Sequence, residues 1–537
     1  MNIFSFSPFG YEGALVAVEV DLRRGIPAVD IVGLADGAVK EARERMRAAI
    51  RNSGFEFPME RVLISLAPAD LKKEGAGFDL ALALSVLGES NFCSKENSQD
   101  EKSDSIGNKP APEDSVLKEP ILVMGELELN GAIRPVRAVH AAASTAAATG
   151  IAKCIVSAAN AAEAREVAGM KVFGAANLAQ AYEALSKPEL FTCAKEGDEE
   201  AFLPNGYVEV NGVLFPEEER SADFVDIKKQ TKLVRALQIA AAGGHNVLAY
   251  GPPGCGKTLA MQRFSSILPL LTVEEAQTTT RIHSLAGLLK PSEPLMRTMP
   301  FRMPHQTASI EGICGGGINC RPGEISLAHN GILFLDEAAE FKTSVLQMLR
   351  VPLESGFITL SRAGRTTTYP ARFQLLMASN PCPCGNYGNE GKICLCSAKS
   401  VDTYWRKFSG PLLDRVDIRI NVKTDMEKTA PVSSAELRKQ IADAVLIQRK
   451  RQGKKNAYLS PKEIQEFCHL KKDERKFLEE SVSHNDFSQR AISGILKLSR
   501  TIADMEKSEK IKIENLSEAI SLRANSGPLG LFGNSDL

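Results

Sequence analysis

The sequence has no long hydrophobic run and almost no net charge. No stretch approaches the roughly 18 consecutive apolar residues that a membrane-spanning helix requires. The first residues, Met-Asn-Ile-Phe-Ser-Phe-Ser-Pro, lack the charged start and apolar core of a signal peptide. The 65 Lys and Arg and the 66 Asp and Glu leave a formal charge of −1, so any nucleic-acid contact must come from local basic surface. These absences argue against a membrane protein and against a secreted one.

What is present fits a multidomain cytoplasmic protein. With 537 residues, the chain is long enough for about three domains. Its 44% hydrophobic and 24% charged residues are ordinary for a soluble globular protein. The eleven cysteines, odd in number and unevenly spaced, indicate a reducing compartment. We therefore expect a soluble, cytoplasmic protein without a membrane segment.

Residues 1–190 predict an α+β domain. Apolar segments over 14–20 and 61–67 are typical of strands. Residues 40–51 are dense in helix formers, and an Ala- and Leu-rich run over 78–87 predicts a second helix. Strands followed by helices favour an α+β arrangement.

Two stretches of different composition adjoin these elements. Residues 93–118 are mainly Ser, Glu, Asp, Lys, Asn and Pro, which cannot bury enough apolar surface to offset the entropy of ordering, so we expect a disordered insert. Residues 191–222 are acidic and contain Pro and Gly, and they predict a linker or a peripheral flap. Between the two stretches, Asn130-Gly131 marks the turn of a hairpin.

A phosphate-binding motif follows an apolar run at 247–250. The motif reads Gly-Pro-Pro-Gly-Cys-Gly-Lys-Thr and fits the P-loop pattern, in which backbone N–H groups surround phosphate oxygens. Lys257 is expected to reach the β/γ-phosphates and Thr258 to ligate Mg²⁺. An ordinary Gly/Pro turn is the alternative. The residues predicted to hold the nucleotide are Gly251, Pro252, Pro253, Gly254, Cys255, Gly256, Lys257, Thr258 and Leu259.

Polar residues close two further apolar runs. The run Gly-Ile-Leu-Phe-Leu ends in Asp336 and Glu337, as a buried parallel strand does at its carboxyl end, where ligands bind. We expect Asp336 to hold Mg²⁺ and Glu337 to polarise the attacking water, with an acidic helix start as the alternative. Asn380 closes a second run and can orient that water. Arg415 lies before another strand, and at a subunit edge it can stabilise transition-state charge in the next subunit.

Two local patterns suggest further binding sites. A hairpin over 357–373, turning at Ala363-Gly364, carries Arg362 and Arg365, which suit a DNA backbone or form a solvated tip. A short loop carries two pairs of cysteines, which predict a tetrahedral zinc site, although reduced, non-ligating thiols are the alternative. These cysteines are Cys382, Cys384, Cys394 and Cys396.

Five motifs together resemble AAA+ ATPases, and more narrowly the magnesium-chelatase-like ComM/YifB family. They are the P-loop, Pro300-Phe-Arg-Met-Pro-His, the segment 321–337, Asn380-Pro-Cys-Pro-Cys-Gly and Ser409-Gly-Pro-Leu-Leu-Asp-Arg. The resemblance implies an α/β fold: an AAA+ P-loop core over 223–430 with an α-helical lid over 431–537, preceded by an α+β, ribosomal-S5/Lon-like domain. One departure is Gln306, where the family usually has the second of two histidines.

The family likeness also implies roles. Asn380 corresponds to sensor 1, Arg415 to the arginine finger, and Arg490 to the sensor 2 arginine that contacts the γ-phosphate. The family uses ATP and Mg²⁺, forms homo-oligomeric rings, and includes branch-migration helicases of natural transformation and recombination. We therefore expect a hexameric DNA motor. A chelatase-type remodeller of a protein partner, without nucleic acid, is the alternative.

The front domain also resembles the proteolytic domain of Lon-type proteases, which uses a Ser–Lys dyad. The matching segments begin at Lys73 and Gly125. The Ser position falls near Gly77 and the Lys position near His140, while Ser85 lies outside any matching motif. Because nucleophilic catalysis needs both members, we do not expect proteolysis.

Overall fold

The computed structural model describes most of the chain. The described residues are 2–34, 36–69, 71, 73, 75–99, 119–193, 206–217, 223–290, 293–362, 365–387, 392–423, 430–485 and 487–523. The predicted insert from residue 100 onward, parts of the predicted linker, the turn at 363–364 and the end of the predicted lid lie outside them. No described helix is long and apolar enough to cross a membrane.

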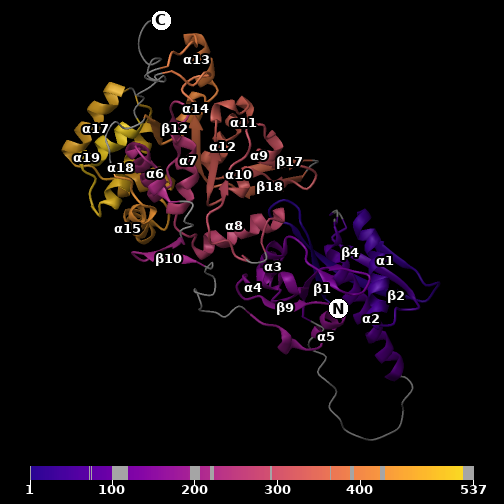
Figure 1. Ribbon diagram of the computed structural model, residues 1–537. Coiled ribbons are helices and arrows are strands. Elements are labelled where there is room, and N and C mark those ends of the chain that lie inside the picture. Colours follow the sequence, from indigo (N-terminus) through magenta and orange to yellow (C-terminus); the bar gives the residue numbers. More distant parts are fainter. Residues whose placement is uncertain are drawn as a thin grey trace.

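The N-terminal domain is built on a seven-stranded mixed sheet in the order β3-β4-β2-β1-β5-β8-β9 (Figure 1). The side chains of β4 alternate between buried and partly exposed, as a strand with one core face requires. By contrast, all four residues of β5 are buried, which suits a central strand. The strands are β1 (Ile3–Ser7), β2 (Ala14–Arg23), β3 (Val29–Val32), β4 (Arg61–Ala67), β5 (Ile121–Met124), β8 (Lys153–Ser157) and β9 (Lys171–Ala175).

Helices and a small hairpin complete this domain. The hairpin of β6 (Glu126–Leu127) and β7 (Ile133–Arg134) confirms the turn predicted at Asn130-Gly131. The helices are α1 (Gly37–Asn52), α2 (Asp79–Gln99), α3 (Val139–Ala148), α4 (Ala161–Arg165) and α5 (Leu178–Ala184). Helix α2 is longer than predicted, since it continues through the first seven residues of the segment expected to be a disordered insert.

The central domain has a five-stranded sheet in the order β13-β16-β19-β12-β20, and every pair is parallel. Strands β12, β16 and β19 are buried along their whole length, which confirms the parallel α/β core predicted from their apolar runs. The strands are β12 (Val247–Tyr250), β13 (Phe301–Arg302), β16 (Ile332–Leu335), β19 (Gln374–Ser379) and β20 (Ile418–Asn421). The helices are α6 (Thr231–Gly243), α7 (Lys257–Arg263), α8 (Val273–Ala286), α9 (Ile310–Cys314), α10 (Glu324–Leu327), α11 (Thr343–Met348), α12 (Arg350–Ser355), α13 (Ala398–Arg406) and α14 (Gly410–Leu413).

Three hairpins extend from this core. Two of them, β14 (Gly315–Gly316) with β15 (Arg321–Pro322) and β17 (Phe357–Arg362) with β18 (Arg365–Pro370), are antiparallel. The third lies in the predicted linker, where β10 (Tyr207–Val210) pairs with β11 (Val213–Pro216). Val213 and Phe215 of β11 are buried, and the guanidinium of Arg438 lies 5.5 Å from the Phe215 ring centroid. The β10–β11 part of the predicted linker is thus packed on the core, whereas Thr192 pairs with Val172 of β9 in the N-terminal domain.

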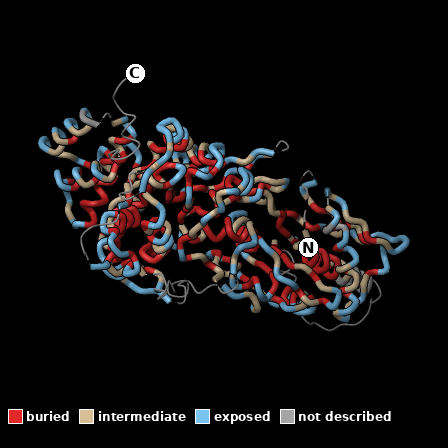
Figure 2. Tube along the Cα trace, turned by 45° about the horizontal axis from the view of Figure 1, so that its top comes forward, coloured by how far each residue is buried: buried red, intermediate tan, exposed pale blue. Residues whose placement is uncertain are grey.

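A C-terminal helical bundle covers one side of the core (Figure 1). Its helices are α15 (Ser434–Gln452), α16 (Pro461–Phe467), α17 (Lys472–Asn485), α18 (Gln489–Met505) and α19 (Ile513–Arg523). The side chains of Ser433 and Ser460 cap the N-termini of α15 and α16. Asp504 is buried and accepts hydrogen bonds from Arg451 and Arg500. Figure 2 shows buried residues throughout this bundle, the core and the N-terminal domain.

Helix α8 joins the core to the N-terminal domain. Its Gln277 accepts a 2.7 Å hydrogen bond from Nε2 of His140 on α3 and donates to the carbonyl of Glu166. Arg281, one turn further along α8, donates to the carbonyls of Tyr11 and Glu12. Helix α8 of the central domain is therefore hydrogen-bonded to both side chains and backbone of the N-terminal domain.

Candidate functional site

The P-loop connects the buried strand β12 to helix α7. Lys257 is 7% exposed, and its ammonium donates to the carbonyls of Gly251 at 2.8 Å and Pro252 at 2.9 Å. Gly254 and Gly256 have φ of +81° and +85°, a conformation that favours glycine. The loop therefore curls around its own lysine, whose charge lies where phosphate oxygens are expected.

Thr258 and Asp336 meet at the carboxyl ends of two strands. The Thr258 hydroxyl donates to Oδ1 of Asp336 at 3.1 Å, and the same oxygen accepts from the backbone N–H of Glu337 at 3.0 Å. Glu337 is exposed and has φ of +49°, which a side chain adopts at some cost and which redirects the chain after β16. A hydroxyl and a carboxylate at this spacing fit the oxygen ligands that Mg²⁺ prefers.

Asn380 follows β19, the strand that lies between β16 and β12. Ser379 is in register with Tyr250, and its carbonyl accepts from the N–H of Gly251 at 3.3 Å. Asn380 therefore leaves the sheet between the acidic pair on one side and the P-loop on the other. This is the position from which a polar side chain can contact a water between them.

A cavity of about 310 Å³ lies around Gln230, a residue that contacts the P-loop. Ile227, Val234 and Val432 contribute apolar side chains to its lining. Gln230, also in the lining, donates from Nε2 to the carbonyl of Cys255 at 2.8 Å. Sequence reasoning missed these residues, because they lie in separate segments that carry no motif.

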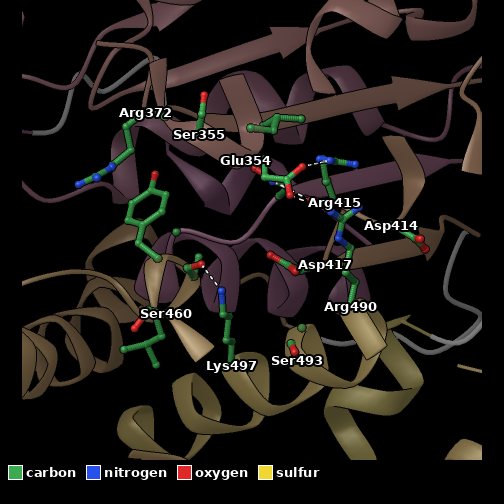
Figure 3. Close-up of a pocket in the computed structure, with 18 of the residues that line it drawn as sticks. Glu354, Ser355, Arg372, Asp414, Arg415, Asp417, Ser460, Arg490, Ser493 and Lys497 are labelled. Carbon is green, nitrogen blue, oxygen red and sulfur yellow. Dashed lines mark hydrogen bonds and ion pairs between the residues drawn. The ribbon is translucent and has the colours of Figure 1, made fainter. Parts of the chain in front are cut away.

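Arg415 and Arg490 converge on Glu354 in a cavity of about 420 Å³ (Figure 3). Nη2 of Arg490 donates to Oε1 of Glu354 at 2.7 Å, and Nη2 of Arg415 forms an ion pair with the other carboxylate oxygen. The hydrogen bond from Arg415, supported by the charges of both arginines, holds the pKa of Glu354 below its usual value. Glu354 lies on α12 and Arg490 at the start of α18, so the core and the helical bundle both contribute to the cluster.

This arginine cluster lies near the amino end of β12, whereas the P-loop lies at the carboxyl end of the same strand. We call these two sides of the sheet the arginine edge and the P-loop edge. The Arg415 carbonyl accepts from Asn246, which directly precedes β12, whereas the P-loop directly follows β12. A four-residue strand spans about 13 Å at roughly 3.3 Å per residue. Arg490 therefore lies beside Arg415 and away from Lys257 of the same chain.

The two hairpin arginines have partners within the chain. Nη1 of Arg362 lies 3.7 Å from Oε1 of Glu311, and both side chains are exposed. The guanidinium of Arg365 lies 5.2 Å from the ring centroid of Phe9 in the N-terminal domain. The hairpin thus contacts the N-terminal domain next to its turn.

The four loop cysteines form one cluster. Sγ of Cys382 lies 3.4 Å from that of Cys384 and 3.7 Å from that of Cys394, and all four sulfurs lie within 4.8 Å of one another. Tetrahedral zinc with Zn–S bonds of about 2.3 Å separates its sulfurs by about 3.8 Å. The cluster, completed by Cys396, therefore fits a tetrahedral zinc ion. All ten cysteines whose side chains the structure describes are free of disulfides.

The protease dyad has no counterpart at the predicted positions. Gly77 carries no nucleophile, and the Ser85 hydroxyl is buried and donates to the carbonyl of Ala81 at 2.8 Å. Burial lowers the pKa of His140 to about 4, so its imidazole is neutral at neutral pH and serves the contact with Gln277.

A parallel sheet with a P-loop after its central strand, an acidic pair after a nearby strand and a helical C-terminal bundle define an AAA+ type of P-loop protein. Three family models match the chain: magnesium chelatase subunit ChlI over residues 223–430, a second ChlI description over 18–160, and the ChlI C-terminal region over 431–523. The chain belongs to the magnesium-chelatase-like ComM/YifB family.

Two relatives match almost end to end, and a third matches in part. The competence protein ComM of Haemophilus influenzae is 38% identical over 528 residues, which cover 97% of both chains. The protein YifB of Escherichia coli strain K12 is 39% identical over 523 residues, which cover 96% of this chain and 95% of that one. The magnesium-chelatase 38 kDa subunit of Acidiphilium rubrum is 26% identical over 185 residues, 29% of this chain and 52% of that one.

Proposed function

We propose that this protein is an ATP-dependent AAA+ motor that assembles as a homo-oligomeric, hexameric ring and acts on DNA as a branch-migration helicase. The observation that carries the proposal is the separation of the P-loop and its acidic pair from the arginine cluster within one chain. A head-to-tail arrangement brings the arginines of one copy to the P-loop of the next, and such heterologous contacts close into rings.

Within one copy, the proposed ATP site combines the P-loop with the two neighbouring strand ends. The P-loop backbone, from Gly251 to Leu259, surrounds the phosphates, and Lys257 exchanges its carbonyl partners for phosphate oxygens. Thr258 and Asp336 hold Mg²⁺, which neutralises phosphate charge when bound. The cavity beside Gln230 takes the base.

Hydrolysis requires a correctly placed water and charge stabilisation. Glu337 polarises the water as general base, and Asn380 orients it from the strand between. Arg415 and Arg490 leave Glu354 and contact the phosphates of the neighbouring copy, where they stabilise the charge of the transition state. This assignment keeps Arg490 as a γ-phosphate contact but moves it to the neighbour's nucleotide.

DNA is the proposed substrate because the β17–β18 hairpin carries Arg362 on the surface of the protein. Arg362 pairs with Glu311, and both side chains are exposed. Exposed ion pairs contribute only about 0–1 kcal/mol, so the phosphate backbone can displace Glu311 from Arg362. Arg365 is the second proposed DNA contact. The name of the relative ComM, a competence protein, supports a role in DNA uptake or recombination. The free cysteines support a cytoplasmic location.

We further propose that the cysteine cluster binds a zinc ion with a structural role. The four sulfurs match the tetrahedral spacing, and the cluster directly follows Asn380 in the chain. Metal analysis of the purified protein is expected to give one zinc per chain. Less than one equivalent after gentle purification counts against the site.

The test compares ATP hydrolysis with and without single-stranded and forked DNA at low salt. We expect DNA to stimulate hydrolysis, and the variant R362A/R365A to lose DNA binding and stimulation while its nucleotide affinity stays unchanged. Absence of both stimulation and binding at low salt refutes the DNA substrate. If DNA and nucleotide affinity fall together, the hairpin is not the DNA contact.

A chelatase-type remodeller of a protein partner is the second candidate. One observation favours it: both hairpin arginines already have partners inside the chain, Arg362 with Glu311 and Arg365 with Phe9. In that case DNA leaves the rate of ATP hydrolysis unchanged, although ring assembly and the shared ATP site are retained.

A further inference from the structure

The cysteine cluster is fixed against the P-loop. A Cβ placed on Gly385 would lie 3.0 Å from Cδ of Pro253, so the cysteine loop directly contacts the phosphate-binding loop. Nε1 of Trp405 donates to the carbonyl of Pro381 at 3.0 Å, which ties the start of the same loop to the core. Any surface that the cluster positions therefore lies beside the proposed ATP site.

Two large apolar side chains alternate with the last two cysteines. Cys394 and Cys396 direct their sulfurs into the cluster, while Ile393 and Leu395 are 82% and 88% exposed. In an extended segment alternate side chains point to opposite sides, so ligation of the cysteines directs both aliphatic chains outward. This apolar pair, Ile393 and Leu395, contributes nothing to the core, and exposed adjacent apolar groups mark interaction surfaces.

A matching apolar surface lies at the arginine edge. Val351 is 67% exposed and lies one turn before Glu354 on α12, so the two share a face of the helix. Met348, which is 44% exposed, is the last residue of α11, and α12 begins two residues later. This apolar strip, Met348 and Val351, therefore lies next to the side chains that the proposed function brings to the neighbour's ATP site.

We propose that the apolar pair of one copy docks against the apolar strip of the next copy, and that zinc holds the pair in its docking position. The inference rests on the proposed head-to-tail ATP site, because that arrangement alone brings the P-loop edge of one chain to the arginine edge of the next. The occupant is a second copy of this chain, since the two surfaces flank the two halves of the same site.

The test measures ring assembly of the full-length protein with a slowly hydrolysed ATP analogue, by mass photometry over a range of protein concentrations. For the variant I393S/L395S we expect the concentration needed for assembly to rise about a hundredfold, because two aliphatic side chains lose their burial. Its zinc content and thermal unfolding are expected to match the wild type. The control variant I26S/M59S changes two N-terminal residues that are 87% and 82% exposed, and it is expected to assemble like the wild type.

Two further variants test the partner surface and the metal. M348S/V351S is expected to show the same defect, and combining it with I393S/L395S adds little, because both changes remove one contact. C384S/C394S, which loses zinc, is expected to assemble as poorly as I393S/L395S.

Normal assembly of I393S/L395S overturns the docking contact. If this variant assembles normally but loses only its stimulation by DNA, the pair contacts DNA instead of a neighbouring chain. A wild-type protein that neither assembles nor hydrolyses ATP refutes the proposed function itself, so the two failures are distinguishable.

Discussion

Mixing two inactive variants tests whether the ATP site is shared between copies. K257A removes the lysine proposed to bind phosphate, and R415A removes the arginine proposed to act on the neighbouring copy. Each variant alone is expected to be almost inactive, because an arginine finger contributes about 10³–10⁵ in kcat. In a 1:1 mixed ring, a contact works when an R415A chain supplies the P-loop and a K257A chain supplies the arginines. Random mixing makes about a quarter of the contacts productive.

The same design assigns Arg490. If Arg490 acts on the neighbour's nucleotide, R490A mixed with K257A recovers about a quarter of the activity, while R490A mixed with R415A recovers none because no chain keeps both arginines. If Arg490 acts on its own chain's nucleotide, the second mixture recovers activity and the first does not. The assay is ATP turnover per chain after the variants are mixed as monomers and then assembled.

The result that refutes this reasoning is specific. Mixed rings of K257A and R415A that form, as shown by mass photometry, but stay inactive exclude a shared site. Substantial activity of R415A alone also excludes it, because the arginine then contributes nothing to the transition state.

Three further changes test individual groups. E354Q removes the negative charge that holds both arginines, and each of these partly exposed ion pairs contributes up to about 1 kcal/mol. We therefore expect ATP hydrolysis to be up to about fivefold faster at low salt and unchanged at high salt. Slower hydrolysis at all salt concentrations means that Glu354 positions the arginines. D504A leaves the buried guanidinium of Arg500 without its carboxylate, so we expect the helical bundle to lose about 3–5 kcal/mol in urea unfolding followed by circular dichroism, and an unchanged curve contradicts this. Zinc removal by a chelator is expected to change the fluorescence of Trp405, the single tryptophan, because its indole donates to Pro381 at the start of the cysteine loop; unchanged fluorescence with zinc fully removed contradicts it.

Local patterns predicted the strands and the loop where each occupies consecutive residues. The P-loop and the run ending in Asp336-Glu337 each occupy one short segment, so residue order alone predicts a strand followed by a phosphate loop or by acids. The hairpin of β10 and β11 also has a local signal, because Asn211-Gly212 joins two runs that contain alternating apolar residues. The acidic residues around it favoured a linker instead. The length of α2 was missed because the polar composition after residue 92 favours disorder.

Long-range pairings could not be predicted from sequence. Glu354 lies in a short helix without a motif, and nothing local connects it to Arg490, which is 136 positions away. The sequence places Arg490 near a helix start, but the edge of the sheet that this helix meets depends on how the bundle packs. The cavity at Gln230 likewise joins residues before and within α6 to residues before and within α15.

The arginine cluster is better explained by a second chain than by the stability of one chain. Its ion pairs involve Glu354 and Arg490, each more than half exposed, and such pairs contribute about 0–1 kcal/mol. Arg415 is only 12% exposed, and its Nε is buried without a hydrogen-bond partner among the described residues. An unsatisfied buried donor costs about 1–3 kcal/mol, so holding Arg415 at this edge does not stabilise the single chain. In the proposed ring, the phosphates of a neighbouring copy offer Arg415 a second anionic partner besides Glu354.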